Sequence, residues 1–309
     1  MGTPEFAVAS LEKLVKEKYN VVAVVTVPDK PAGRGQKLQE SEVKQFAIQN
    51  NIPVLQPEKL KSQEFLDQLQ SFAPDLQIVV AFRMLPEVVW KFPKLGTFNL
   101  HGSLLPQYRG AAPINRAVMN GETKTGVTTF FLQQEIDTGN IIFQEEIPIG
   151  ENETAGEIHD RMMHVGANLV AKTVDAIAAG DVPQIPQSSL VKLGEEIKSA
   201  PKIFRDDCKI NWEWSGNKIH NHIRGLSPYP AAWTELHRQS GEIILLKFFK
   251  SKLIPGNQNL KPGTIIDKLD IAVPDGVIEI LEIQAPGKKK ITAAEFLRGF
   301  KFQEGDCLK

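Results

Sequence analysis

The chain has 309 residues, with 36 Lys+Arg against 37 Asp+Glu and a formal net charge of −1. This length predicts two domains, and a content of 42% hydrophobic residues excludes a disordered, collagen-like or coiled-coil chain. Because the net charge is close to zero, the chain as a whole is not drawn to nucleic acid or membrane. Any binding to a polyanion would therefore require a local basic patch.

The two cysteines, Cys208 and Cys307, exclude a disulfide framework and a cysteine-based zinc site. We expect reduced thiols in a reducing compartment, which predicts a cytoplasmic protein. No stretch approaches the ~20 apolar residues that a membrane helix needs. The first residues do not combine a basic segment with a following apolar segment, so no secretory signal is expected.

The first half of the chain alternates helical and strand-like patterns. Apolar spacing predicts helices, the second of them capped by Ser41, over residues 4–19, 41–51, 62–72, 113–120 and 154–179. Apolar runs predict strands over residues 21–27, 75–82, 96–100, 127–132 and 141–147. Such alternation is typical of βαβ units, so we expect an α/β domain with a mostly parallel sheet.

The pattern changes near residue 200. The stretch 181–201 holds three prolines among Gln and Ser, which predicts a linker. After it we expect helices over 215–225 and 293–300, and short strands over 232–237, 243–249, 264–266 and 277–283. Short strands at this spacing favour a small barrel. The expected organisation is a first domain over 1–182, a linker over 183–204 and a second domain over 205–309.

A dense group of polar residues follows the predicted strand over 96–100. Asn99 and His101 are two residues apart on that strand, so they face the same side, and a loop rich in Gly and Pro follows. Sites in open α/β sheets lie at the carboxyl ends of strands, and Asp137 follows a second strand. Histidine can relay a proton, a carboxylate can orient its ring, and an asparagine amide can donate to an oxyanion. These residues suit acyl transfer to an amine, although the pattern alone leaves a structural role open.

Four segments carry a resemblance to a known family. They are the block from Asn99 to Pro113 with Asp137-Thr138-Gly139, the opening residues 2–7, the loop over 28–35, and the segment over 227–234. In these segments the chain resembles the 10-formyltetrahydrofolate-dependent formyltransferases, and the similarity extends over nearly the whole sequence. The resemblance implies a Rossmann-like formyltransferase domain followed by a small C-terminal β-barrel domain that is OB-like.

The resemblance also implies an activity. The expected enzyme transfers a formyl group from 10-formyltetrahydrofolate to the α-amine of methionyl-initiator tRNA, without a metal. Asn99 and His101 would hold the developing oxyanion, and His101 with Asp137 would move the amine proton. The residues expected to line the folate pocket are Phe82, Arg83, Met84, Leu85, Ser103, Leu104, Leu105, Pro106, Gln133 and Glu135.

The same resemblance implies contacts with tRNA. Arg34, which lies between two glycines, would reach the acceptor end, and its guanidinium suits phosphate because it donates two hydrogen bonds. In the C-terminal domain, Lys288, Lys289 and Lys290 would contact the phosphate backbone. The alternative interpretations are a solvated loop arginine and a solvated lysine turn. We expect a monomer.

Two alternatives to this activity remain. Gly102 stands where the family motif usually has Ala, and Gly also occurs there in sugar-nucleotide N-formyltransferases, which share the scaffold. The Arg34 loop and Thr138 favour the tRNA substrate instead. Phe82-Arg83 also stands where many members have Tyr-Gly. The second alternative, from another class, is an inactive folate- or tRNA-binding protein.

The start of the chain leads to a separate hypothesis. In the family a short strand precedes the Gly-Thr-Pro turn, and here Met1 occupies the position before that turn. We therefore hypothesise that the sequence lacks its first strand. Because that strand is central in a doubly wound sheet, its neighbours would be left without a partner.

Overall fold

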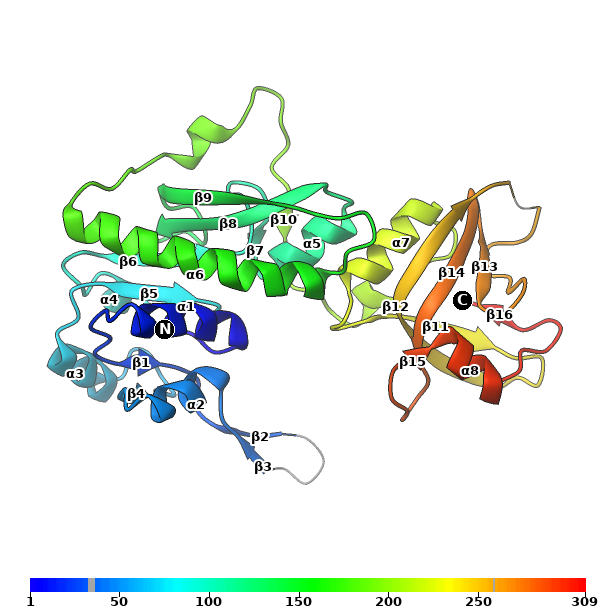
Figure 1. Cartoon of the computed structure of the whole chain (residues 1–309), viewed down its shortest axis with the longest axis horizontal. Helices are drawn as coiled ribbons and strands as arrows, with labels where there is room; N and C mark the ends of the chain where they lie inside the picture. The colour runs from blue at the N-terminus through cyan, green and yellow to red at the C-terminus, as the bar shows by residue number, and fades with distance from the viewer. Residues whose placement is uncertain (33–36, 258) are drawn as a thin grey trace. The chain divides into compact units, whose positions relative to one another are not determined.

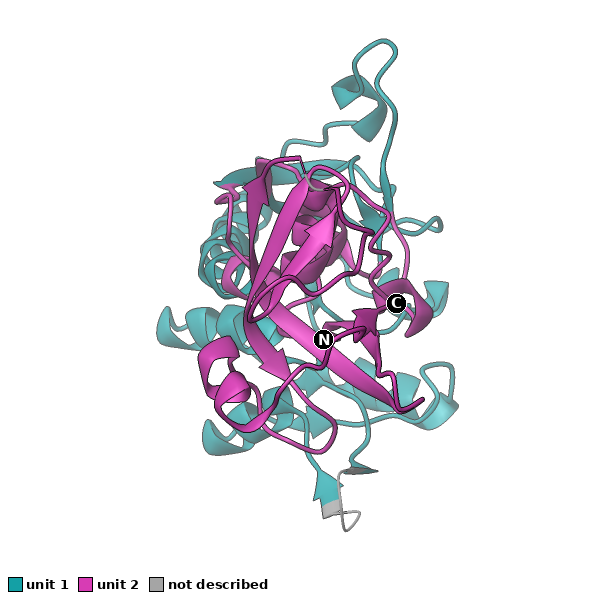
Figure 2. Ribbon diagram, turned by 90° about the vertical axis from the view of Figure 1, so that its right-hand side faces the viewer, with its two compact units in different colours: residues 1–110, 126–147, 159–199 teal, residues 111–125, 148–158, 200–309 magenta. Residues whose placement is uncertain are grey.

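The computed structural model describes residues 1–32, 37–257 and 259–309 (Figure 1). The chain forms two compact units, each built from separated stretches of sequence (Figure 2). Unit 1 contains residues 1–110, 126–147 and 159–199, and unit 2 contains residues 111–125, 148–158 and 200–309. Within the described ranges, no helix has both the length and the apolar character needed to cross a bilayer.

The helices of unit 1 form where the apolar spacing predicts them, except for the short α4, which was not predicted. Ser41 accepts a hydrogen bond from the Lys44 N–H (3.2 Å) and Ser62 accepts one from the Phe65 N–H (3.4 Å). Each cap satisfies a first-turn donor that has no partner within its helix. The helices that lie wholly or mostly in unit 1 are α1 (Glu5–Lys16), α2 (Glu42–Gln49), α3 (Gln63–Phe72), α4 (Glu87–Trp90) and α6 (Ala155–Ala179).

Within the described residues, the strands of unit 1 form three two-stranded pairs and one four-stranded sheet. The pair β1–β4 is parallel, β2–β3 is an antiparallel hairpin, β7 pairs with β10 (Ser199–Ala200), and a four-stranded sheet has the order β5-β6-β8-β9. In that sheet β5 runs parallel to β6, and β6 runs antiparallel to β8. The bounds are β1 (Val24–Val25), β2 (Lys30–Ala32), β3 (Lys37–Gln39), β4 (Val54–Leu55), β5 (Gln77–Val80), β6 (Thr97–His101), β7 (Arg109–Gly110), β8 (Lys124–Phe131) and β9 (Ile141–Pro148).

Met1 and Gly2 connect β1 with β5. The Gly2 N–H donates to the Val25 carbonyl (3.0 Å) and the Val80 N–H donates to the Met1 carbonyl (3.0 Å). Beside this connection lies a cavity of about 620 Å³, lined by residues 20–25 on one side and 74–78 on another. Of the strand predicted over 21–27, the structure forms β1 at Val24–Val25 alone. The hypothesis of a further strand before Met1 stays a prediction.

Helix α6 covers one face of the four-stranded sheet (Figure 1). A Cβ on Gly166 of this helix would lie 2.8 Å from Cδ2 of Leu100 on β6, and the hydroxyls of Thr173 and Thr129 are hydrogen-bonded at 2.9 Å. Side chains alternate along a strand, so Leu100 faces α6 while its neighbours Asn99 and His101 face the other way. The candidate catalytic pair thus lies on the face of the sheet away from α6.

Unit 2 is built around a curled antiparallel sheet. Its strand order is β13-β14-β12-β11-β16, and β15 also pairs with β14. The strands are β11 (Ala232–His237), β12 (Ile243–Pro255), β13 (Asp270–Val273), β14 (Gly276–Gln284), β15 (Ile291–Thr292) and β16 (Cys307–Leu308). The helices are α5 (Pro113–Met119), α7 (Gly216–Gly225) and α8 (Ala293–Gly299).

The segment predicted as a strand over 264–266 connects the two edges of this sheet through isolated bridges. The Leu308 N–H of β16 donates to the Gly263 carbonyl (2.9 Å), and the Ala272 N–H of β13 donates to the Thr264 carbonyl (2.9 Å). Both edge strands thereby gain a backbone partner, which curls the sheet into a half-barrel. The predicted α/β domain followed by a barrel-like domain is confirmed.

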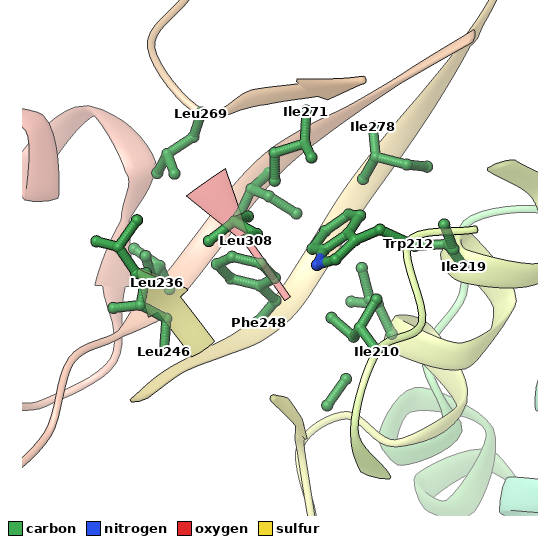
Figure 3. Close-up of a cluster of buried hydrophobic side chains, with 14 of the residues drawn as sticks. Ile210, Trp212, Ile219, Leu236, Leu246, Phe248, Leu269, Ile271, Ile278 and Leu308 are labelled. Carbon is green, nitrogen blue, oxygen red and sulfur yellow. The ribbon is translucent and has the colours of Figure 1, made fainter. Parts of the chain in front are cut away.

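The core of unit 2 fills the concave side of this sheet (Figure 3). Trp212 is 4% exposed, and its indole N–H donates to the Thr234 hydroxyl at 3.0 Å. Its ring meets Phe248 edge to face, with centroids 6.2 Å apart. Burying a large aromatic side chain with its polar atom satisfied stabilises the unit without an unpaired donor.

Candidate active site

His101 lies at the carboxyl end of β6 and is 7% exposed. Its Nε2 is 2.9 Å from the Tyr108 carbonyl oxygen. A carbonyl can only accept, so Nε2 carries a hydrogen and donates it. In the neutral ring Nδ1 is then unprotonated, and it lies 3.9 Å from Oδ2 of Asp137. That separation is too long for a direct hydrogen bond, but it gives a strong attraction once the ring is protonated.

Asp137 is held in an unusual backbone conformation. Its φ is +55°, in the left-handed region that non-glycine residues rarely adopt. The Gly110 N–H donates to Oδ2 at 2.9 Å, and the carboxylate is 11% exposed. The carboxylate therefore has one fixed backbone partner and keeps lone pairs for His101 or a substrate.

Asn99 stands two residues before His101 on the same face of β6. Its side chain is half-buried, and within the described part of the chain its amide has no hydrogen-bond partner. Phe130 of β8 is its cross-strand neighbour and also meets the His101 ring edge to face at 6.5 Å. The amide donors of Asn99 are consequently available to a bound molecule. The structure thus brings Asn99, His101 and Asp137 into one region of unit 1.

The loop after β6 is tied down by internal hydrogen bonds. The buried Ser103 hydroxyl donates to the Gln107 carbonyl (2.6 Å), and the Leu105 N–H donates to the Thr128 hydroxyl (3.1 Å). The Gln144 amide donates to the Leu105 carbonyl (2.8 Å). The Leu105 side chain packs with Phe130, and Pro106 is buried as well. These side chains fix the shape of the loop, while Leu104 is half-buried.

The segment 82–85 has divided roles. Arg83 donates to the carbonyls of Pro57 and Glu58, the latter at 2.9 Å. Leu85 is buried in the apolar cluster that Phe82 borders, and Met84 is 76% exposed. The guanidinium of Arg83 therefore holds the loop at Pro57 and Glu58. Within this segment Met84 has the most exposed side chain that a bound molecule could contact.

The other predicted contact residues are spread over the molecule. Gln133 and Glu135 are exposed in the loop that leads to Asp137. Lys290 pairs with Glu282 at 2.7 Å, whereas Lys288 and Lys289 are exposed in the turn before it. Arg34 lies outside the described residues.

The sequence did not reveal two backbone groups that contact the candidate catalytic side chains. The Tyr108 carbonyl fixes which ring nitrogen of His101 carries the hydrogen, and the Gly110 N–H holds the Asp137 carboxylate. Neither role leaves a residue-type signal, because any residue supplies a carbonyl and any residue except proline supplies an N–H. Among the described residues, no group of three or more His, Cys, Asp or Glu side chains is arranged to hold a metal ion.

Both parts of the chain match known families of proteins. Residues 1–174 match the family described as formyl transferase, and residues 202–301 match the formyl transferase C-terminal domain. The chain belongs to the formyl transferase family, as its sequence motifs predicted.

Individual members of this family are similar to the chain over nearly its full length. The chain is 54% identical over 313 residues to the methionyl-tRNA formyltransferase of Bacteroides fragilis, covering 100% of this chain and 96% of the relative. It is 53% identical over 309 residues to that of Bacteroides thetaiotaomicron, covering 99% and 96%. The solved structure of WlaRD, a sugar 3N-formyl transferase in the presence of dTDP and 5-N-formyl-THF, matches with a TM-score of 0.63. That match has 24% identity over 93% of this chain and 97% of the other, and it shows the shared fold.

Proposed function

We propose that the chain transfers the formyl group of 10-formyltetrahydrofolate to the α-amine of methionyl-initiator tRNA, as the formylation step of translation initiation. The observation that carries this function is identity above 50%, through both domains, to relatives named methionyl-tRNA formyltransferase. The sugar-nucleotide alternative rests on a shared fold at 24% identity and is the weaker candidate. The chain is accordingly an enzyme that transfers a one-carbon group.

The reaction needs two bond changes and one proton transfer. The methionyl amine nitrogen forms a bond to the formyl carbon, whose oxygen becomes negatively charged in the tetrahedral intermediate. The bond from that carbon to N10 of the folate then breaks, and the proton lost by the amine goes to N10. The protein must therefore stabilise an oxyanion and carry a proton between two nitrogens.

The proposed roles follow from the geometry of the three side chains. The Asn99 amide, which is free of other partners among the described residues, donates to the oxyanion. His101 takes the amine proton at Nδ1, because its Nε2–H is already given to the Tyr108 carbonyl. The protonated Nδ1 can then donate to the oxyanion or pass the proton to N10. Asp137, 3.9 Å away, stabilises the imidazolium.

Substrate binding is proposed for both domains. The catalytic domain spans 1–182, and its folate pocket is formed by the segments 82–85, 103–106 and 133–135; WlaRD, solved with 5-N-formyl-THF, supports folate as the donor. The linker spans 183–204, and the domain over 205–309 contacts tRNA through Lys288 to Lys290. Arg34 makes a second tRNA contact at the acceptor end. We also propose that the chain acts in the cytoplasm as a monomer.

The function is tested with the purified chain, 10-formyltetrahydrofolate and two acceptors in parallel. Charged methionyl-initiator tRNA should yield formyl-methionyl-tRNA, while an amino-sugar nucleotide should remain unmodified. Modification of the sugar alone would transfer the assignment to the second candidate. Folate binding without transfer to either acceptor would assign the chain to the inactive binding class.

A further inference from the structure

Gln187 lies in the segment predicted as a linker, yet it is only 4% exposed. It begins a short 3-10 helix (Gln187–Leu190), and an antiparallel bridge two residues earlier anchors it. In that bridge Ile185 and Ile141 exchange both backbone hydrogen bonds, each 2.9 Å long. The backbone before Gln187 is thus fixed against the strand that follows the Asp137 loop.

The side-chain amide of Gln187 makes four hydrogen bonds in two directions. Its Nε2 donates to the carbonyls of Asp137 (2.8 Å) and Gly139 (2.9 Å). Its Oε1 accepts from Nε (3.0 Å) and Nη2 (2.6 Å) of Arg109. Carbonyls only accept and a guanidinium only donates, so the partners themselves fix which end of the amide faces which way.

These bonds connect the supports of both catalytic side chains. On one side, Gln187 donates a hydrogen bond to the loop in which Asp137 adopts φ +55°. On the other side, it accepts hydrogen bonds from Arg109, which lies between Tyr108 and Gly110 in the chain. The Tyr108 carbonyl accepts from His101, and the Gly110 N–H donates to Asp137. One buried amide therefore links the two backbone segments that orient His101 and Asp137.

We propose that Gln187 is a positioning residue for formyl transfer: it sets the placement of the Asp137 carboxylate relative to His101. This inference rests on the proposed function, since it assigns a task within the same site. Without the two donors of Gln187, the Asp137 loop is free to leave its strained conformation, which moves the carboxylate away from Nδ1. Misplacement by about 1 Å costs on the order of 100-fold in rate.

The test uses the full-length chain, initiator methionyl-tRNA and 10-formyltetrahydrofolate. Gln187→Ala removes all four bonds, and we expect kcat to fall about 10- to 100-fold while KM for both substrates changes less than about twofold. Gln187→Glu keeps the side-chain volume and the pairing with Arg109 but loses the donors to the loop. It should fold normally and be as slow as Gln187→Ala. The matched control is Gln184→Ala, which removes an exposed glutamine three residues away and should leave kcat unchanged.

A double variant separates positioning from general loss of structure. If Gln187 acts through Asp137, adding Gln187→Ala to Asp137→Asn should lower kcat by less than about twofold further. The proposal is wrong if the double variant loses the product of the two single-variant losses in kcat. It is also wrong if a folded Gln187→Glu variant keeps the wild-type kcat. If the unaltered chain formylates no methionyl-tRNA, the proposed function itself fails. An active chain with unimpaired Gln187 variants removes only the positioning role.

Discussion

Nδ1 of His101 lies 3.9 Å from Oδ2 of Asp137, and both side chains are nearly buried. The other ring nitrogen is committed to a backbone carbonyl, so a proton that His101 gains must go to the nitrogen facing the carboxylate. A charge pair in surroundings with little water attracts more strongly than the same pair in solvent. In the proposed mechanism this nitrogen is the one that would accept the proton of the incoming amine.

Replacing the ring tests this role. We expect His101→Ala to lower kcat by about 10²- to 10⁴-fold, the usual contribution of a general acid–base group. The matched control is His164→Ala, because His164 is exposed on α6 and should not contribute. Steady-state formylation of methionyl-tRNA measures both. A folded His101→Ala variant with near-normal turnover would remove this residue from the mechanism.

The Asn99 amide is expected to stabilise the oxyanion. Asn99→Ala removes the donors and should cost about 10²- to 10³-fold in kcat, with little change in stability because the side chain is half-buried and has no partner among the described residues. Asn99→Asp keeps the shape but places a negative charge next to the developing oxyanion. It should be at least as slow as Asn99→Ala. Comparable activity of the Asp and wild-type chains would contradict the assigned role.

Local sequence signals predicted the elements that depend on local contacts. Helices α2 and α3 begin at their serine caps because capping involves residues three apart in the chain. The strand predicted over 21–27 forms only at Val24–Val25, because strand pairing depends on a neighbouring strand from another part of the chain, here β4. Strand β13, which pairs with the adjacent β14, was not predicted although its partner is local. The hydrogen bond from the Leu308 N–H to the Gly263 carbonyl was harder to predict because it joins residues far apart in the chain.

The same division holds in the candidate site. Alternation along β6 places Asn99 and His101 on one face, and the structure agrees. Residue types could not predict that Gln187 reaches back 50 positions to the Asp137 carbonyl. Its surroundings in sequence, with prolines and polar residues, are typical of a linker. The Gln187 amide is buried by residues that are distant in the sequence, so no pattern in the residues around it predicts this burial.

Arg83 provides a test that separates stability from substrate binding. Its guanidinium donates to the Pro57 and Glu58 carbonyls, so Arg83→Ala should lower the free energy of unfolding by about 1–3 kcal/mol. Urea unfolding measures this loss, and Arg298→Ala serves as the exposed control, since that side chain is 77% exposed. If Arg83 also lines the proposed folate pocket, KM for 10-formyltetrahydrofolate should rise in the folded variant. An unchanged KM would limit Arg83 to holding the loop.

In a chain that is prepared to start at Met1, the α-amino group of that residue makes stability depend on pH. It donates to the Ile78 carbonyl at 2.6 Å, and burial lowers its pKa from 8.0 to about 5. Between these values the unfolded chain binds a proton that the folded chain does not, so the free energy of unfolding should rise from pH 5 to pH 8. Below about pH 5 both states are protonated and the full cost of a buried charge is present. The difference corresponds to about 4 kcal/mol.

Acetylation of the Met1 amine isolates this contribution. The acetylated group cannot titrate, yet it keeps an N–H that can donate to Ile78, so the folded contacts change little. Urea unfolding at pH 5.5 and pH 8 should show a smaller pH difference for the acetylated chain than for the free amine, with Met1 verified by mass in both. Other titrating groups cancel in this comparison because the two chains share them. Equal pH differences would show that the amine is solvated in the folded state, since a solvated amine keeps its ordinary pKa and contributes no slope.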